Sequence, residues 1–145
     1  MSIKIKHSGS VVWVGATKDG RGAISTESRA LDGYPYGFSS RFEGKPGSNP
    51  EELLAAAHAA CFTMATSLVL GQEGFTADEL NTTAEVTLEQ VDSGWSITAI
   101  HLTMTGKIAD IDPMTFALLA GAAKENCPVS KVLKAPITLD TVLVS

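Results

Sequence analysis

The chain has 145 residues, a length typical of one domain and sufficient to bury a substantial core. It carries 11 Lys and Arg residues against 16 Asp and Glu residues, for a formal net charge of −5, and its basic residues are scattered along the sequence. This balance argues against nucleic acid or an anionic membrane surface as a partner. We therefore expect a single domain over residues 1–145.

The amino-terminal part has the alternating pattern of β-strands. Residues 1–6 alternate apolar and charged side chains, which differs from the charged-then-apolar layout of a signal peptide. Val12 and Val14 continue the strand pattern, and the pair Asp19-Gly20 is typical of a hairpin turn. These features predict a small antiparallel meander over residues 3–27 and a cytoplasmic protein.

The next segment, residues 28–48, is rich in Gly, Pro, Ser and aromatic side chains. A loop of this length inside a compact domain is usually either functional or disordered, and its four aromatic residues argue against disorder. We expect a functional loop that leads directly into the following helix.

The uncharged stretch 53–72 is dominated by Ala and Leu, which are strong helix formers, and predicts the principal helix of the chain. Asn49 and Pro50 are typical of an N-cap and a first helical position. Gly71 and Gly74 are residues at which a helix commonly stops.

This helix is long enough to be tested as a membrane span, because a bilayer core requires about twenty apolar residues. Its alanines are only weakly apolar, no Lys, Arg, Trp or Tyr flanks it, and it contains the polar residues His58, Thr63, Thr66 and Ser67. We therefore expect a core helix that its own protein covers on all sides, and no membrane partner.

The second half of the chain begins with a strand pattern. Apolar and polar residues alternate over 82–89, followed by a turn at residues 92–94 and a partner strand over 95–104. The apolar parity of the partner strand changes partway, which predicts a β-bulge near Ala99.

The remaining segments predict two helices and a last strand. Asp112 should cap a helix running to about Asn126, and Pro128 should begin a short helix through about Leu133, with Cys127 as its N-cap. The strand 137–144 closes the chain. The predicted class is α+β, with antiparallel strands around central helices.

The chain has two cysteines, Cys61 and Cys127, and neither belongs to a Cys-x-x-Cys or other metal-binding motif. An unperturbed thiol is only a few per cent thiolate at pH 7. The middle of a helix does not activate Cys61, because the helix dipole falls off within the first turn and burial raises a thiol pKa. A cation is needed: Arg41 is the nearest candidate by sequence, and Glu51 is suited to hold its guanidinium.

Each of these residues also has a plainer interpretation. Cys61 could be a small buried hydrophobe, Arg41 a surface arginine and Glu51 an ordinary first-turn acid. His58 lies one turn before Cys61 and could be its base, although a hydrogen-bonded core histidine is the favoured interpretation. Cys127, at a helix N-terminus, has the more acidic local environment, so the residues alone leave the roles of the two cysteines open.

Four motifs closely resemble the OsmC branch of the OsmC/Ohr family, and the resemblance extends over essentially the whole chain. They are RFEG at 41–44, NPEEL at 49–53, HAACF at 58–62 and CPVS at 127–130. Ohr proteins share the two cysteines but carry their arginine in an earlier loop, so the position of Arg41 favours the OsmC branch.

The resemblance implies an OsmC-like α+β fold, with antiparallel sheets wrapped around central helices, in an intertwined homodimer whose subunits both contribute to each active site. It implies an antioxidant, thiol-dependent peroxidase in which Cys61 is the peroxidatic cysteine, Cys127 the resolving cysteine, and Arg41 with Glu51 the activating pair.

No haem, flavin or metal is expected. An external thiol, of which the resemblance suggests a dithiol of the lipoyl type, would reopen the Cys61–Cys127 disulfide. Organic hydroperoxides are expected to be better substrates than hydrogen peroxide, through an apolar pocket lined by some of the aromatic residues Tyr36, Phe38, Phe42 and Phe62.

Two other functions remain open at this point. The chain could be a non-catalytic module that binds an apolar ligand or partner and has inert thiols. It could also be a cysteine hydrolase that uses Cys61 and His58.

Overall fold

The computed structural model of the chain describes residues 2–92 and 94–144. It divides into two compact units, residues 1–50 and 51–145. Each unit has its own three-stranded sheet. That the whole chain acts as one domain stays a prediction.

The first unit is an antiparallel sheet followed by a short helix. Its elements are β1 (Gly9–Val14), β2 (Arg21–Thr26), β3 (Tyr34–Tyr36) and α1 (Phe38–Phe42). The order β1-β2-β3, with β1 and β2 antiparallel, confirms the predicted meander and its turn before Arg21. The predicted strand character of residues 3–6 is wrong: residues 2–8 lie outside any strand, and the first strand begins at Gly9.

The segment 28–48 is more ordered than a loop, because it contains β3 and α1. The Ser40 hydroxyl holds it together: it accepts the Gly37 N–H at 2.9 Å and donates to the Ser48 carbonyl oxygen at 2.7 Å. Ser40 and Ser48 are both buried. The expectation of a loop throughout this segment is therefore wrong, since two short elements and a buried hydroxyl fold it.

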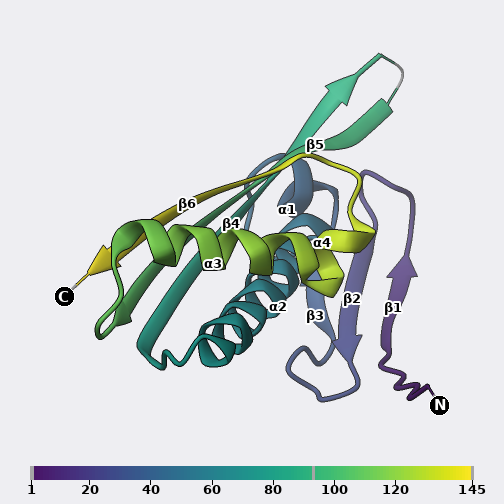
Figure 1. Cartoon of the computed structure of the whole chain (residues 1–145). Helices are drawn as coiled ribbons and strands as arrows, with labels where there is room; N and C mark the ends of the chain where they lie inside the picture. The colour runs from purple at the N-terminus through teal and green to yellow at the C-terminus, as the bar shows by residue number, and fades with distance from the viewer. Residues whose placement is uncertain (1, 93, 145) are drawn as a thin grey trace. The chain divides into compact units, whose positions relative to one another are not determined.

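The second unit packs helices on a mixed sheet (Figure 1). Its elements are α2 (Pro50–Gln72), β4 (Ala77–Val91), β5 (Gly94–Ile108), α3 (Pro113–Asn126), α4 (Pro128–Val132) and β6 (Ile137–Val144). β4 and β5 are antiparallel, but β5 and β6 are parallel. The prediction of antiparallel strands is wrong for β6, because α3 and α4 form a crossover that returns the chain in the same direction.

Most predicted boundaries in this unit are confirmed. The strand register shifts between Thr87 and Leu88, which pair with Ala99 and Ile97 and so place the bulge where the sequence predicts it. The turn predicted at residues 92–94 includes Ser93, which lies outside the described residues.

The helix ends follow simple capping chemistry. α2 begins at Pro50 and ends at Gln72, and Gly74 has a φ of 84°, the left-handed conformation expected after a helix. Gly71, by contrast, is still helical. Asp112 caps α3 by accepting the Thr115 N–H at 2.8 Å, as predicted.

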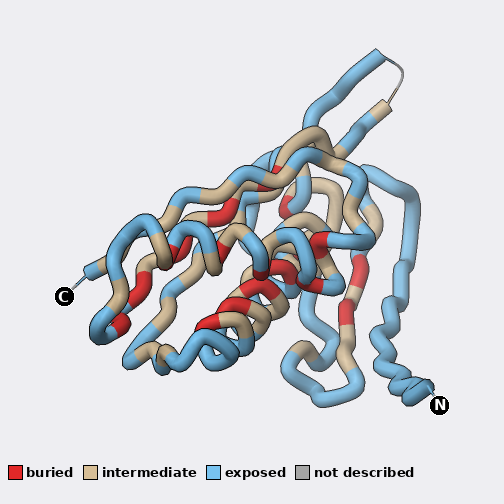
Figure 2. Tube along the Cα trace, viewed as in Figure 1, coloured by how far each residue is buried: buried red, intermediate tan, exposed pale blue. Residues whose placement is uncertain are grey.

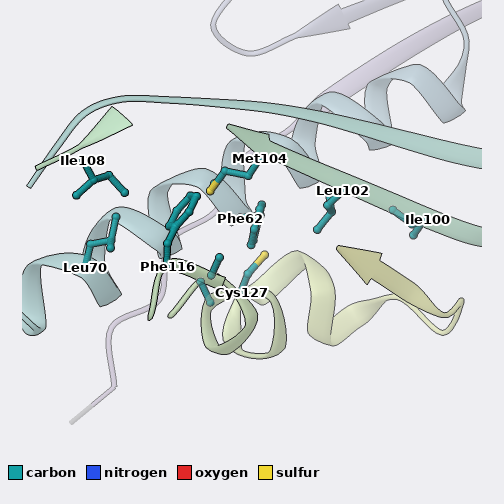
Figure 3. Close-up of a cluster of buried hydrophobic side chains, with 10 residues drawn as sticks. Phe62, Leu70, Ile100, Leu102, Met104, Ile108, Phe116 and Cys127 are labelled. Atoms are coloured by element: carbon teal, nitrogen blue, oxygen red, sulfur yellow. The ribbon is translucent and has the colours of Figure 1, made fainter. Parts of the chain in front are cut away.

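The core of the second unit lies between the helices and the sheet (Figures 2 and 3). α2 contributes one narrow stripe, made of residues four apart: His58, Phe62, Thr66 and Leu70. Phe62 of α2 and Phe116 of α3 are both fully buried. Buried side chains of β5, including Leu102 and Met104, complete the cluster. This packing positions Cys127, which belongs to the same cluster.

The opposite face of α2 is open. Met64 is 75% exposed and Leu68 is 62% exposed, so the expectation that this helix is covered on all sides is wrong for a single chain. The physical reason is that α3 and the sheet pack against one stripe only. α2 is also long and apolar enough to cross a membrane, although core helices of soluble proteins pass the same test.

Gly106 on β5 should be a sensitive position in this core. A Cβ at Gly106 would lie 2.6 Å from Cζ of Phe116, far closer than carbon atoms approach. We expect Gly106→Ala to lower the free energy of unfolding by about 1–3 kcal/mol, as overpacking of a rigid core does. Urea-induced unfolding measures this change.

The matched control is Gly121→Ala in α3. A Cβ at Gly121 meets no atom within 4 Å, so alanine should stabilise the helix by up to about 1 kcal/mol. Equal unfolding midpoints for Gly106→Ala and the parent chain would contradict the packing described here.

Candidate active site

Two cysteines from distant parts of the sequence meet in the second unit. Cys61 lies in the middle of α2, and Cys127 lies between α3 and α4. Their Sγ atoms are 3.0 Å apart, and both residues are free thiols. Cys127 is only 1% exposed, whereas Cys61 is half-buried. The two sulfurs are therefore close enough to react with each other, and Cys61 is the more accessible.

The backbone around Cys127 explains its position. Its N–H still bonds to the Ala123 carbonyl oxygen at the end of α3, while Pro128 begins α4. Cys127 itself is extended, with φ −63° and ψ 131°, and its Sγ accepts the N–H of Ser130 at 3.5 Å. The prediction that Cys127 is the N-cap of a short helix is confirmed.

The two thiols have opposite electrostatic environments. Burial raises the pKa of Cys61, and the hydrogen bond between the two thiols raises it further. Burial would also raise the pKa of Cys127, but hydrogen bonds from Cys61 and from the backbone and side chain of Ser130 outweigh it and lower the pKa. Within this unit Cys127 is therefore the more readily ionised thiol.

His58 is a core residue, as the sequence analysis favours. It is fully buried, and its Nε2 lies 2.8 Å from Oγ of Ser130. Burial lowers the pKa of His58, so the imidazole is neutral at pH 7. Its ring is engaged with Ser130, which leaves the alternative role as a base for Cys61 without geometric support.

Arg41 and Glu51 lie in different units. Arg41 is in α1, and its guanidinium carbon lies 5.2 Å from the centre of the Phe42 ring. Glu51 is the second residue of α2. The structure thus brings Cys61 and Cys127 together, while the pairing of Arg41 with Glu51 stays a prediction.

Arg41 also lines a pocket of about 170 Å³ within the first unit. Its other lining residues are Trp13, Thr17, Tyr36, Gly37, Phe38 and Phe42. Three of the four aromatic residues expected in a substrate pocket are among them. The fourth, Phe62, is fully buried in the core of the second unit and cannot line a pocket that is open to substrate.

Ser130 is the residue that the sequence analysis overlooked. It appears there only as the last letter of the CPVS motif, yet it contacts both His58 and Cys127. Its place in the sequence could have revealed the contact with Cys127, because the third residue of a helix presents its N–H to the N-cap side chain.

Within residues 2–92 and 94–144, no group of three or more His, Cys, Asp or Glu side chains could hold a metal ion.

Comparison with known proteins adds independent information. Residues 42–142 match the family described as OsmC-like protein. The chain belongs to the OsmC-like family. This membership confirms the resemblance seen in the four sequence motifs, and the matched region includes both cysteines.

Several members of the OsmC-like family are similar over most of their length. The chain is 53% identical to "Peroxiredoxin OsmC" of Escherichia coli K12 over 136 residues, which cover 94% of this chain and 95% of that protein. It is 31% identical to "Organic hydroperoxide resistance protein OhrB" of Bacillus subtilis, over 78% of this chain and 82% of the relative.

Solved structures show the same fold. An OsmC-like protein of unknown function from Vibrio cholerae aligns with a TM-score of 0.75 at 15% identity, over 96% of this chain and 100% of that protein. At this identity the likeness concerns the fold alone, and it confirms the predicted OsmC-like α+β class.

The contact between the two thiols can be tested with two substitutions of one residue. Cys61→Ser keeps a hydroxyl donor opposite Cys127, whereas Cys61→Ala removes it. Because a donor stabilises the thiolate, the pKa of Cys127 should be lower in Cys61→Ser than in Cys61→Ala. The ultraviolet absorbance of the thiolate as a function of pH measures the difference.

Ionised tyrosines absorb in the same region, so the variant Cys61→Ala/Cys127→Ala supplies the baseline. Identical titration curves for the two single variants would show that Cys61 donates no hydrogen bond to Cys127.

Proposed function

We infer that this OsmC-like chain is a cysteine-based peroxidase in which Cys61 reacts with a hydroperoxide and Cys127 resolves the oxidised product. The single observation that carries the assignment is the 3.0 Å distance between two free thiols, one buried and one half-buried. The similarity to proteins named peroxiredoxin and organic hydroperoxide resistance protein supports the same activity.

The reaction has two oxidative steps. The Cys61 thiolate attacks one peroxide oxygen, the O–O bond breaks, and the alkoxide leaves and takes up a proton to become an alcohol. Cys61 is then a sulfenic acid. The Cys127 thiolate attacks the Cys61 sulfur, a disulfide forms, and the hydroxyl group leaves with a proton as water.

A reductant must return the enzyme to its starting state. An external dithiol, which we expect to be of the lipoyl type, donates two electrons to the Cys61–Cys127 disulfide and is itself oxidised to a disulfide. The protein chemistry calls for no prosthetic group in these steps. We place this cycle in the cytoplasm, where such reductants keep thiols reduced.

Activation of Cys61 is the difficult part of this mechanism. Burial raises its pKa, so the second unit by itself disfavours the attacking thiolate. We propose that Arg41, held by Glu51, supplies the missing positive charge and stabilises the departing alkoxide. The motif resemblance supports this assignment, and the aromatic pocket around Arg41 suits an apolar hydroperoxide better than hydrogen peroxide.

We also propose that the protein is a homodimer. Ala59, Ala60, Thr63, Met64 and Ser67 of α2 line an open groove of about 510 Å³ together with Thr82 of β4. A long apolar helix face of this kind on a water-soluble enzyme marks a surface for another polypeptide. A second copy of the chain is the partner that the family resemblance implies.

The assignment of the two cysteines predicts that substituting each one impairs the peroxidase reaction at a different step. Cys61→Ser should abolish hydroperoxide consumption, while Cys127→Ser should allow one oxidation per chain and then stall or over-oxidise. One equivalent of an alkyl hydroperoxide should consume both thiols of the parent chain, with a mass decrease of about 2 Da for the disulfide. Thiol counting and mass spectrometry measure these outcomes.

The same experiment separates the rival functions. Survival of both thiols would favour a non-catalytic binding module. Turnover without any reducing thiol, with an acyl-thioester intermediate, would indicate a hydrolase. If Cys127→Ser abolishes the first oxidation and Cys61→Ser does not, the two roles are reversed.

The role of Arg41 predicts a change in thiol ionisation. Arg41→Ala should raise the pKa of Cys61 and slow hydroperoxide reduction, because the thiolate loses its cation. The pH dependence of Cys61 alkylation in a Cys127→Ser background measures the shift. Arg29→Ala is the matched control, since Arg29 is an exposed arginine that pairs with Asp32 at 3.0 Å. Equal profiles for Arg41→Ala and Arg29→Ala would remove Arg41 from the site.

A further inference from the structure

A buried polar chain runs behind the two thiols. The His58 ring on α2 contacts the Ser130 hydroxyl on α4, with 2.8 Å between Nε2 and Oγ. Ser130 in turn donates its backbone N–H to the Cys127 sulfur at 3.5 Å, and its side chain helps to lower the pKa of Cys127. His58 is fully buried and Ser130 is 8% exposed, so the chain lies inside the protein.

The direction of this chain follows from the other nitrogen of His58. Among the described residues, Nδ1 of His58 is buried and has no hydrogen-bond partner. A neutral imidazole has one N–H donor and one acceptor nitrogen, and a buried N–H without a partner is the rarer of the two kinds of orphan. The proton therefore belongs on Nε2, which donates to Oγ of Ser130.

This direction determines what the Ser130 hydroxyl does. Since its oxygen accepts the hydrogen bond from His58, its own proton is free to be donated to Sγ of Cys127. The sulfur then receives the Ser130 hydroxyl in addition to the Ser130 N–H. Two donors from one residue favour the thiolate over the thiol.

We propose that His58 and Ser130 form a one-way hydrogen-bond chain, Nε2–H to Oγ–H to Sγ, that holds Cys127 as a thiolate ready to close the disulfide. The proposal rests on the assignment of Cys127 as the resolving cysteine. Ser130 acts on the sulfur directly, and His58 is a positioning residue that acts through Ser130.

The hydrogen-bond chain from His58 through Ser130 explains how Cys127 meets a requirement of the second oxidative step. Cys127 must attack as a thiolate, although burial alone opposes its ionisation. The thiolate gives its electron pair to the new S–S bond, and the proton needed by the departing hydroxyl group comes from solvent on the half-buried side of Cys61. Rapid closure of the disulfide protects the Cys61 sulfenic acid from further oxidation.

Few other titratable groups face the Cys127 sulfur within the described residues. Cys61 approaches it from α2, and β5 contributes apolar side chains of the core. On α3, Lys124 directs its Nζ to the Ile137 carbonyl oxygen at 3.2 Å and lies 3.3 Å from Glu125. The chain from His58 through Ser130 is thus the principal side-chain influence on Cys127 apart from Cys61.

The test uses the Cys61→Ser protein, in which Cys127 is the only thiol, and follows thiolate absorbance against pH. Ser130→Ala and His58→Leu should each move the Cys127 midpoint to higher pH. His58→Gln, whose amide can still donate, should restore part of the shift. In the double variant, His58→Leu should add nothing to Ser130→Ala, because His58 acts through Ser130.

Thr66→Val is the matched control, since Thr66 lies buried on the same α2 stripe and donates its hydroxyl to the Phe62 carbonyl oxygen. It should leave the Cys127 midpoint unchanged. Additive shifts for His58→Leu and Ser130→Ala, or no shift for either, would overturn the proposal. Nitrogen-15 NMR of the His58 ring in the parent chain is an independent check, and an Nδ1–H tautomer would also overturn it.

A second measurement separates this proposal from the proposed function. With Cys61 restored and one equivalent of alkyl hydroperoxide, Ser130→Ala should shift the product from disulfide toward Cys61 sulfinic acid. If the parent chain itself is not oxidised, the peroxidase assignment fails while the titration still decides the hydrogen-bond chain. If the parent protein forms the disulfide and the Ser130→Ala variant forms it equally fast, the hydrogen-bond chain has no part in the attack of Cys127 on oxidised Cys61.

Discussion

The sulfur atoms of Cys61 and Cys127 can meet only because separate segments of the second unit converge on one core. Phe62 directly follows Cys61 and is fully buried, so it draws that part of α2 against the sheet and α3. Phe116 of α3 occupies the space that Gly106 leaves free on β5. α3 then ends beside α2, and its last turn delivers Cys127 to a distance of 3.0 Å.

The same core gives the two thiols different chemistry. Cys61 lies in the middle of a long helix, whose own backbone N–H groups are already used within the helix, and burial raises the pKa of Cys61. Cys127 interrupts two helices, so the N–H of Ser130 is available to its sulfur. A pair in which one thiol awaits activation and the other has a lowered pKa is suited to sequential attack and resolution.

The exposed face of α2 and the pocket around Arg41 are two further features on which the proposed function rests. α2 buries one stripe and leaves Met64 and Leu68 in solvent, and this is the apolar surface that the proposed homodimer would cover. Arg41 lies among aromatic side chains of the first unit, in the pocket proposed for an apolar hydroperoxide. The second unit holds both sulfurs, whereas Arg41, the proposed cation, belongs to the first unit.

Local signals in the sequence determined most of the secondary structure and pointed to the candidate reactive residues. Pro50, Asp112 and Pro128 each begin or cap a helix through their own backbone chemistry, and the parity change near Ala99 records the bulge directly. The motifs around Arg41, Cys61 and Cys127 identified the family. These properties depend on neighbours a few residues apart, which a sequence displays openly.

Tertiary structure alone decided the features that depend on distant neighbours. The parallel pairing of β6 with β5 follows from the path of the crossover, and the open face of α2 follows from how much of the helix the core can cover. Residues 3–6 alternate like a strand but find no partner in the described chain. The contact between His58 and Ser130 joins residues 72 positions apart, so neither residue alone revealed it. A pattern states what a segment can form, whereas packing decides which surfaces meet and which groups are removed from water.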